Sequence, residues 1–180
     1  LEFRRVLFRS RESATVGGTI ATNAGGLRVL RFGDTRAQVL GVEAVLADGT
    51  VVSHLSGLLR DNTGYHLPSL LCGSEGTLAV VTAARLRLVP ARPARVVALL
   101  AFDDLPAALA AAVQLRRAST TIEAVEFFVA DGLALVCAAE SLTPPFATPH
   151  SAYLLVEAAG STDPTEELER AIAGLAGVAD

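Results

Sequence analysis

The sequence predicts an α+β fold in two consecutive parts, and three observations lead to this expectation. Two apolar runs rich in β-branched residues flank Asp48-Gly49, which is the strongest short-range signal for a β-hairpin. The segment from Pro90 to Arg95 marks a boundary, because two prolines within four residues favour an extended link. Beyond that link, strand-like and helix-like segments alternate.

In the first part, the hairpin joins a strand over residues 39–47 to a strand over residues 50–54. Pro68 suits the first turn of a short helix over residues 67–71, and a long strand region follows over residues 77–89. The run from Gly17 to Gly26 contains four glycines and matches neither the P-loop nor the dinucleotide fingerprint. It is either a tight turn with positive φ or bare backbone open to a large anionic ligand.

The second part is predicted to contain, in order, a strand (96–102), a helix (103–118), a strand (122–129), a long loop that includes the proline-rich residues 141–150, a strand (153–158) and a helix (163–173). Leu109, Val113 and Leu115 are expected on the apolar side of the first helix. Glu123 and Glu126 alternate with apolar residues, which favours a half-buried strand. This order is typical of most of a ferredoxin-like layer, open at its C-terminal end.

Composition narrows the class of protein. With 180 residues, 51% hydrophobic and 19% charged, the chain is long enough for one large or two small globular domains. A net charge of −4 argues against a nucleic-acid partner, and no apolar run is long enough for a transmembrane segment. Cys72 and Cys137 lack the spacing of a zinc site or a redox pair. We therefore expect a cytoplasmic protein.

Residues 1–10 differ in character from the rest of the chain. They are far more basic than residues 11–180, and the run from Arg5 to Ser10 matches one translation frame of a common sequencing adapter. A targeting or membrane-surface segment is the alternative. We expect a non-native, adapter-derived segment, so the prediction of the fold begins at residue 11.

Five motifs resemble, in the right order, the FAD-binding domain of the vanillyl-alcohol-oxidase/PCMH-type flavoproteins. They are residues 14–26, 27–33, 46–50, 61–65 and 73–78. Within that family, the resemblance is strongest to the group that oxidises D-2-hydroxyglutarate, D-lactate and glycolate. The motifs at 27–33 and 61–65 favour this group over synthases of alkyl-glycerone phosphate and oxidases of aromatic alcohols.

The resemblance implies the domain organisation. Residues 11–90 correspond to the C-terminal part of the PCMH-type FAD-binding domain, and residues 91–180 correspond to the truncated N-terminal part of a ferredoxin-like cap domain. The chain is therefore expected to be an internal fragment of an enzyme. The family's divalent metal site belongs to a later segment, and no catalytic or metal-binding residue is expected within these 180 residues.

The resemblance also implies noncovalent FAD, because no histidine here matches the site of covalent flavin attachment. Its cofactor-binding positions correspond to Ser13, Thr15, Gly17, Gly18, Ile20, Thr22, Asn23, Gly25, Glu75, Gly76, Val80 and Val81. By this likeness, the residues from 13 to 25 contact the flavin, its phosphates and its ribityl chain. The residues from 75 to 81 meet the adenosine half with their main chain. This sequence departs from the family's usual residues at Ala79, after the motif at 73–78, and at His66 and Leu67, after the motif at 61–65.

The expected function of the intact parent is FAD-dependent oxidation of a D-2-hydroxy acid, of the D-2-hydroxyglutarate kind, to the 2-oxo acid. Two alternatives stay open: a truncated, non-catalytic flavin-binding module, and a subunit of a D-lactate or glycolate oxidase. The particular substrate, the electron acceptor, the oligomeric state and any peripheral membrane association of the parent are left open.

Overall fold

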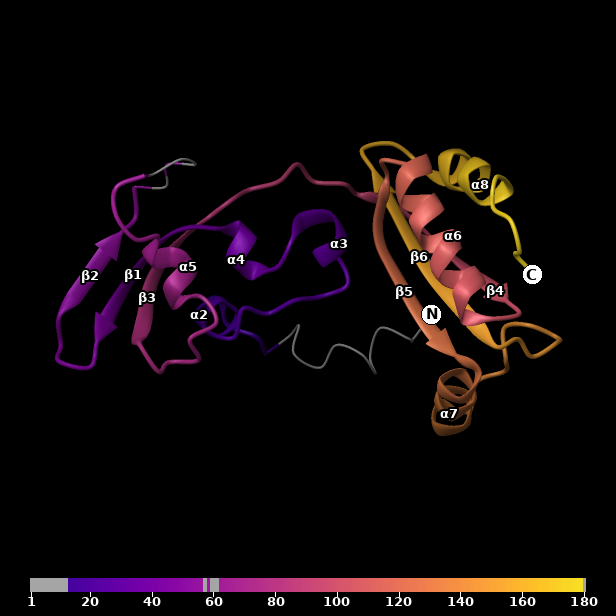
Figure 1. Ribbon diagram of the computed structural model, residues 1–180, viewed down its shortest axis with the longest axis horizontal. Helices are drawn as coiled ribbons and strands as arrows, with labels where there is room; N and C mark the ends of the chain where they lie inside the picture. Colours follow the sequence, from indigo (N-terminus) through magenta and orange to yellow (C-terminus); the bar gives the residue numbers. More distant parts are fainter. Residues whose placement is uncertain (1–12, 57, 59–61, 180) are drawn as a thin grey trace. The chain divides into compact units, whose positions relative to one another are not determined.

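The structure, a computed structural model, describes residues 13–56, 58 and 62–179. The chain divides into two compact units, and the boundary falls between Val89 and Pro90 (Figure 1). The proline-rich link predicted over residues 90–95 therefore coincides with the start of the second unit.

The described residues of the first unit form short helices and a small antiparallel sheet of order β2-β1-β3. In chain order the elements are α2 (Val16–Ala21), α3 (Val29–Phe32), α4 (Thr35–Gln38), β1 (Val39–Leu46), β2 (Val51–His54), α5 (Leu67–Leu71) and β3 (Ala79–Leu86). The predicted hairpin is confirmed, with Val45 opposite Val51 in β1 and β2. The strand predicted over residues 77–89 is shorter, and helices α3 and α4 carried no prediction.

One face of this sheet forms the core of the first unit. Val42 and Ala44 of β1 and Ala79 of β3 pack against Ile20 of α2 and Leu71 of α5. Alternation along the strands turns the other residues to the opposite face. The core therefore fastens the glycine-rich helix α2 directly to the sheet.

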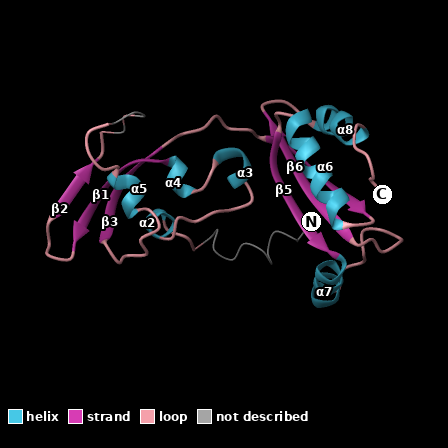
Figure 2. Cartoon of the chain, viewed as in Figure 1, coloured by secondary structure: helices cyan, strands magenta, loops and turns pink. Residues whose placement is uncertain are grey.

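The second unit is an antiparallel sheet of order β4-β6-β5 with helices packed on it (Figure 2). Its elements are β4 (Ala94–Phe102), α6 (Leu105–Ala118), β5 (Ile122–Val129), α7 (Ala130–Glu140), β6 (Ala152–Gly160) and α8 (Thr165–Ala173). Because β4 and β5 both run antiparallel to β6, they flank it as the split β-α-β arrangement of a ferredoxin-like layer does. The predicted α+β class is confirmed.

Helix α7 lies where the sequence predicts the beginning of a long loop. The helix contains Gly132, and Leu133 is buried whereas Leu135 is largely exposed. A run of small and apolar residues on every side of a helix leaves no 3.6-residue period to detect. The loop predicted from the prolines is found only after α7, over residues 141–151.

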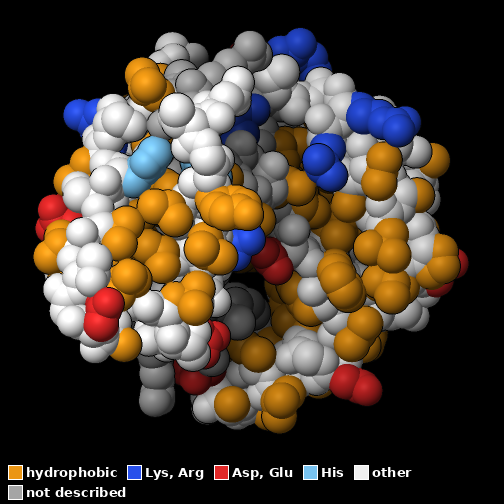
Figure 3. Space-filling view, turned by 60° about the vertical axis from the view of Figure 1, so that its left-hand side comes forward, with side chains coloured by type: hydrophobic (Ala, Val, Ile, Leu, Met, Phe, Trp, Pro, Cys, Tyr) orange, Lys and Arg blue, Asp and Glu red, His pale blue; other side chains and the backbone are white. Residues whose placement is uncertain are grey.

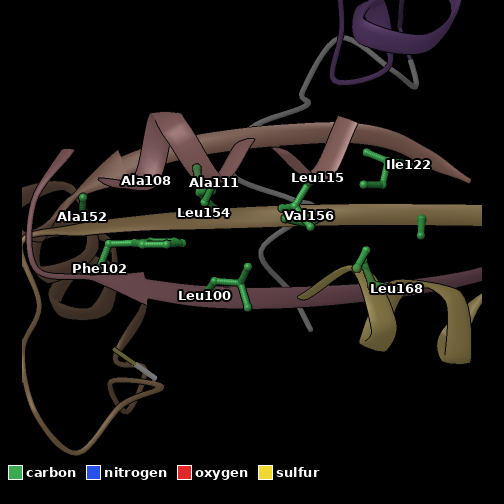
Figure 4. Packing of buried hydrophobic residues seen from close by; sticks show 12 residues of the cluster. Leu100, Phe102, Ala108, Ala111, Leu115, Ile122, Ala152, Leu154, Val156 and Leu168 are labelled. Carbon is green, nitrogen blue, oxygen red and sulfur yellow. The ribbon is translucent and has the colours of Figure 1, made fainter. Parts of the chain in front are cut away.

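The predicted apolar side of α6 is partly wrong. Leu115 is buried, but Leu109 and Val113 are 46% and 47% exposed. Ala108 and Ala111 occupy the buried face instead, against β6 (Figure 4). Small side chains let the helix lie close to the sheet, and nothing in the local pattern favours alanine over leucine as a core residue.

Glu123 also departs from the prediction of a half-buried strand, since this carboxylate is only 1% exposed. A bulge interrupts the pairing of β5 between Ile122 and Ala124. The Glu123 carboxylate lies 3.3 Å from Arg95 Nη1 and 3.8 Å from Arg92 Nε. A buried carboxylate needs such partners, which alternation along one strand cannot reveal.

Candidate cofactor-binding site

The glycine-rich run begins as a helix and not as a turn. Thr15 caps α2, with its Oγ1 accepting a hydrogen bond of 3.0 Å from the Gly18 amide. At the other end, Thr22 Oγ1 donates to the Gly18 carbonyl at 2.9 Å. The glycines of the run have no positive φ, and Asn23 carries the left-handed conformation, with φ of 48°. The positive-φ interpretation of these glycines is therefore wrong, and the bare-backbone interpretation remains.

Two segments that are distant in sequence meet at α2. The Gly73 amide donates to the Ile20 carbonyl at 3.0 Å, and the Glu75 amide donates to the Ala21 carbonyl at 2.8 Å. The second segment is sharply bent, because Glu75 and Gly76 both have positive φ. The structure thus brings residues 15–23 and 73–76 together, as the prediction of one shared cofactor requires.

Strand β3 adds a third side. A Cβ atom built on Gly17 would lie 3.9 Å from the Val81 carbonyl oxygen, so α2 passes close to the strand backbone. Among the described residues β3 pairs with β1 alone, so no second strand of these residues pairs with its other edge. Val81 packs toward the core and Val80 is 67% exposed, so their side chains lie on opposite faces of the sheet.

Asn23, Asp34 and Arg36 form a network of hydrogen bonds next to the glycine-rich run, and the sequence does not predict this network. Asn23 Nδ2 donates to Asp34 Oδ2 at 2.8 Å, and Asn23 Oδ1 accepts from the Arg36 amide at 2.9 Å. Arg36 Nη2 in turn donates to the Cys72 carbonyl at 2.7 Å. Asp34 was detectable in part, because an Asp before a helix is a common N-cap and its Oδ1 accepts from the Ala37 amide.

The network has a defined charge state near neutral pH. The hydrogen bond from Asn23, the backbone amide of Ala37 and the charge of Arg36 hold the pKa of Asp34 below its usual range. Burial raises the pKa of the Cys72 thiol. Asp34 is therefore ionised and Cys72 is a neutral thiol, which suits a weak donor to Asn23 Oδ1 at 3.5 Å.

A groove of about 280 Å³ lies on one side of α2. It is lined by residues of α2, α3 and α4, of the loops between them and of the end of β3, including Val16, Ile20, Val29, Phe32 and Leu86. Among the predicted cofactor-binding residues, Ile20 alone lines this groove. Gly17 does not line it and lies near the Val81 carbonyl. Hydrophobic side chains are exposed over much of the visible surface (Figure 3).

The remaining predicted residues lie at the margins of this arrangement. Ser13 is exposed before α2, and Glu75 is exposed in the bent second segment. A Cβ atom on Gly25 would lie 3.2 Å from Val29 Cγ2, whereas one on Gly76 would meet no atom within 4 Å. Bare backbone with open space before it fits a large ligand that carries phosphates. The individual contacts to FAD stay predictions.

Two absences concern the part of the chain that the structure describes. No three or more side chains of His, Cys, Asp or Glu are grouped there as a metal ion would require. None of the helices in the same ranges has both the length and the apolar character needed to cross a bilayer.

Two family models match the chain. The model described as FAD binding domain matches residues 3–54, and the model described as FAD linked oxidases, C-terminal domain, matches residues 91–179. The chain therefore belongs to the FAD-linked oxidases. The first match begins within residues 1–10, whose non-native origin stays a prediction.

The curated relatives include D-2-hydroxyglutarate dehydrogenases. The enzyme of Xanthomonas citri pv. viticola is 40% identical over 162 residues, which cover 88% of this chain and 33% of the relative. The mitochondrial enzyme of Rattus norvegicus is 43% identical over 152 residues, covering 83% and 28%. A D-lactate dehydrogenase of Archaeoglobus fulgidus is 46% identical over 106 residues, covering 59% and 24%. The chain thus spans a third or less of these relatives.

Among solved structures, an alkyldihydroxyacetonephosphate synthase aligns with a TM-score of 0.63 at 18% identity. The alignment covers 87% of this chain and 30% of the synthase. At that identity the likeness concerns the fold alone. It agrees with the α+β architecture.

Proposed function

We propose that this chain binds FAD noncovalently through residues 13–25 and 75–81, and that the protein to which it belongs oxidises a D-2-hydroxy acid to the 2-oxo acid. The observation that best supports this is the pair of hydrogen bonds from Gly73 and Glu75 to the carbonyls of Ile20 and Ala21. These bonds hold the two glycine-containing segments side by side, where one extended cofactor could contact both.

The proposed contacts follow the local geometry. The backbone of Gly17 and Gly18 approaches the phosphates and the ribityl chain, while Ser13, Thr15, Thr22, Asn23 and Gly25 complete the first segment. The side chain of Ile20 is buried in the core, so Ile20 supports this segment from within. Glu75, Gly76, Val80 and Val81 form the second. The edge of β3 that pairs with no other described strand supports the proposal that backbone N–H and C=O groups of Val80 or Val81 pair with the adenine edge.

The chemistry belongs to the cofactor. Bound FAD would supply the hydride acceptor for oxidation at C2 of the 2-hydroxy acid; with the hydroxyl proton passing to a base, the products would be the 2-oxo acid and reduced FAD. The described residues of this chain bind and orient the cofactor, and we assign none of them to proton transfer. We place that base, and any divalent metal, in a segment beyond these 180 residues.

D-2-hydroxyglutarate is the preferred substrate, because a dehydrogenase named for it is 40% identical across 88% of the chain. D-lactate is the second candidate, since the Archaeoglobus enzyme named for it is 46% identical over a shorter stretch. We further propose that residues 11–90 act as the C-terminal part of the FAD-binding domain and residues 91–180 as the beginning of the cap. We also propose a cytoplasmic location, as the sequence predicts.

The binding proposal is tested by titrating FAD into the wild-type chain and a matched pair of glycine variants. Gly17→Ala has room for its Cβ and lies in a helix, so the fold should be unchanged or slightly more stable. If the backbone of Gly17 approaches the phosphates, this methyl group should raise the Kd for FAD by about tenfold. Gly132→Ala in α7 also has room and should leave the Kd unchanged.

Wild-type affinity in Gly17→Ala would contradict the proposed contact, and absence of FAD binding by the wild-type chain would contradict the proposed function. The substrate class is tested separately on the complete protein. Its flavin absorbance should bleach on addition of D-2-hydroxyglutarate or D-lactate and stay constant with the L-enantiomers. A flavin that no 2-hydroxy acid reduces would exclude this substrate class.

A further inference from the structure

We propose that Arg36 is a positioning residue that sets the spacing between the two cofactor-binding segments without touching the cofactor. The inference rests on the proposed function, because it concerns the same site. It assigns Arg36 and Asn23 to one bridge, which extends from the end of the glycine-rich run to the beginning of the second segment.

Arg36 contacts both segments at once. Its backbone amide donates to Asn23 Oδ1 at 2.9 Å, and Asn23 is the left-handed residue at the end of the first segment. Its guanidinium Nη2 donates to the Cys72 carbonyl at 2.7 Å, immediately before Gly73. Arg36 of α4 therefore connects the two segments through two hydrogen bonds, one from its backbone amide and one from its side chain.

Gly73 shows how closely the bridge is packed. A Cβ atom at this position would lie 3.1 Å from Arg36 Nη2 and 3.1 Å from Asn23 Cβ. The φ of Gly73 is +85°, so its backbone already requires glycine. Gly73 itself is exposed, and the guanidinium and the asparagine flank the side on which a Cβ would stand; the Gly73 amide donates to the Ile20 carbonyl.

The same contacts give Asn23 a structural role beside the one expected for it. An amide oxygen has two lone pairs, and Asn23 Oδ1 already accepts from the Arg36 amide and the Cys72 thiol. Its Nδ2 donates to Asp34. Asn23 therefore fixes the chain direction after α2 through Oδ1 and one N–H of Nδ2, and its contact with the flavin stays a prediction.

Loss of the guanidinium would leave the Cys72 carbonyl without this donor, so that the amide bonds of Gly73 and Glu75 alone would hold the second segment to the carbonyls of Ile20 and Ala21 and its spacing would be less fixed. A binding site whose parts must be ordered on binding has a lower affinity than a preorganised one. Arg36→Ala should therefore raise the Kd for FAD by about tenfold. Arg36→Lys keeps a cationic donor of similar reach and should restore the affinity to within about threefold of wild type.

The test combines FAD titration with amide hydrogen exchange of the FAD-free chain. Arg36→Ala should accelerate exchange at Gly73 and Glu75, while the β1–β2 hairpin exchanges as in wild type. The matched control is Arg31→Ala, which removes the same charge from an exposed position in α3. It should change neither measurement. If Arg36→Ala does not fold, Asn23→Gly decides instead, because glycine tolerates the left-handed conformation while losing the amide.

The outcomes separate the two proposals. Faster exchange with weaker FAD binding in the bridge variants, and recovery in Arg36→Lys, supports positioning. Unchanged exchange, or faster exchange with wild-type affinity, overturns it. A wild-type chain that shows the expected exchange pattern but binds no FAD refutes the proposed function and leaves the bridge as a purely structural device, which also overturns the positioning role.

Discussion

The side-chain amide of Asn23 donates a hydrogen bond of 2.8 Å to the carboxylate of Asp34, and this bond joins the end of the glycine-rich run to the start of α4. The other carboxylate oxygen of Asp34 accepts from the Ala37 amide at 3.1 Å. A single side chain thus caps one helix and supports a left-handed residue eleven positions earlier.

This pair makes the first unit sensitive to acid. The hydrogen bond from Asn23 and the Ala37 amide lower the pKa of Asp34 in the folded chain. A carboxyl with a lowered folded pKa stabilises the fold above its unfolded pKa, and this contribution disappears as the pH falls through the folded value. We expect the Asn23 amide signals in NMR spectra to shift below about pH 4.

Asp34→Asn should abolish that titration at Asn23. Asp48→Asn is the matched control, because the pKa of Asp48 is also lowered, chiefly by the Thr50 backbone amide, but in the distant hairpin turn. It should leave the Asn23 titration intact. An Asn23 signal that does not move with pH in the wild-type chain would contradict the coupling.

Gly73→Ala and Gly49→Ala separate backbone strain from packing. Both glycines have nearly the same φ, +85° and +86°, so each alanine has a strain cost of about 1–2 kcal/mol. Gly49 has no atom within 4 Å of the new Cβ, whereas Gly73 has Arg36 and Asn23 at 3.1 Å. Gly73→Ala should therefore lower the free energy of unfolding by roughly 1 kcal/mol more. If urea denaturation gives equal losses of unfolding free energy for the two variants, Arg36 and Asn23 move away from the new methyl group without cost.

Glu123→Gln should destabilise the second unit. It removes the charge that Arg92 and Arg95 face and leaves a buried amide in their place. Breaking a fully buried pair costs about 3–5 kcal/mol, and the partial exposure of both arginines reduces the expected loss to roughly 2 kcal/mol. Glu126→Gln, exposed on the same strand, should be nearly neutral in thermal unfolding. A neutral Glu123→Gln would contradict this account.

The two thiols should react at very different rates. Cys72 is 1% exposed and burial raises its pKa, so little thiolate is accessible. Cys137 is only partly buried. A thiol reagent should modify one cysteine under native conditions and the second only after urea unfolding. Cys137→Ser should eliminate the early reaction, and rapid modification of that variant would show that the first unit opens readily.

Several elements were predictable because their signals are local. Asp48-Gly49 predicts the hairpin through turn geometry, Pro68 predicts the first turn of α5, and Asp104 with Pro106 predicts the start of α6. The motifs likewise identified the family and both glycine-containing segments. Each of these features depends on residues within a few positions of one another.

The sequence by itself determined the two-part α+β plan, the order of most strands and helices, and the FAD-linked oxidase family. Only the tertiary structure decided that alanines form the buried face of α6, that Glu123 is buried between arginines, and that Asn23 bonds to Asp34 and Arg36. Burial and partner choice depend on residues brought together from distant positions, and no local period or motif encodes which polar side chain finds which partner.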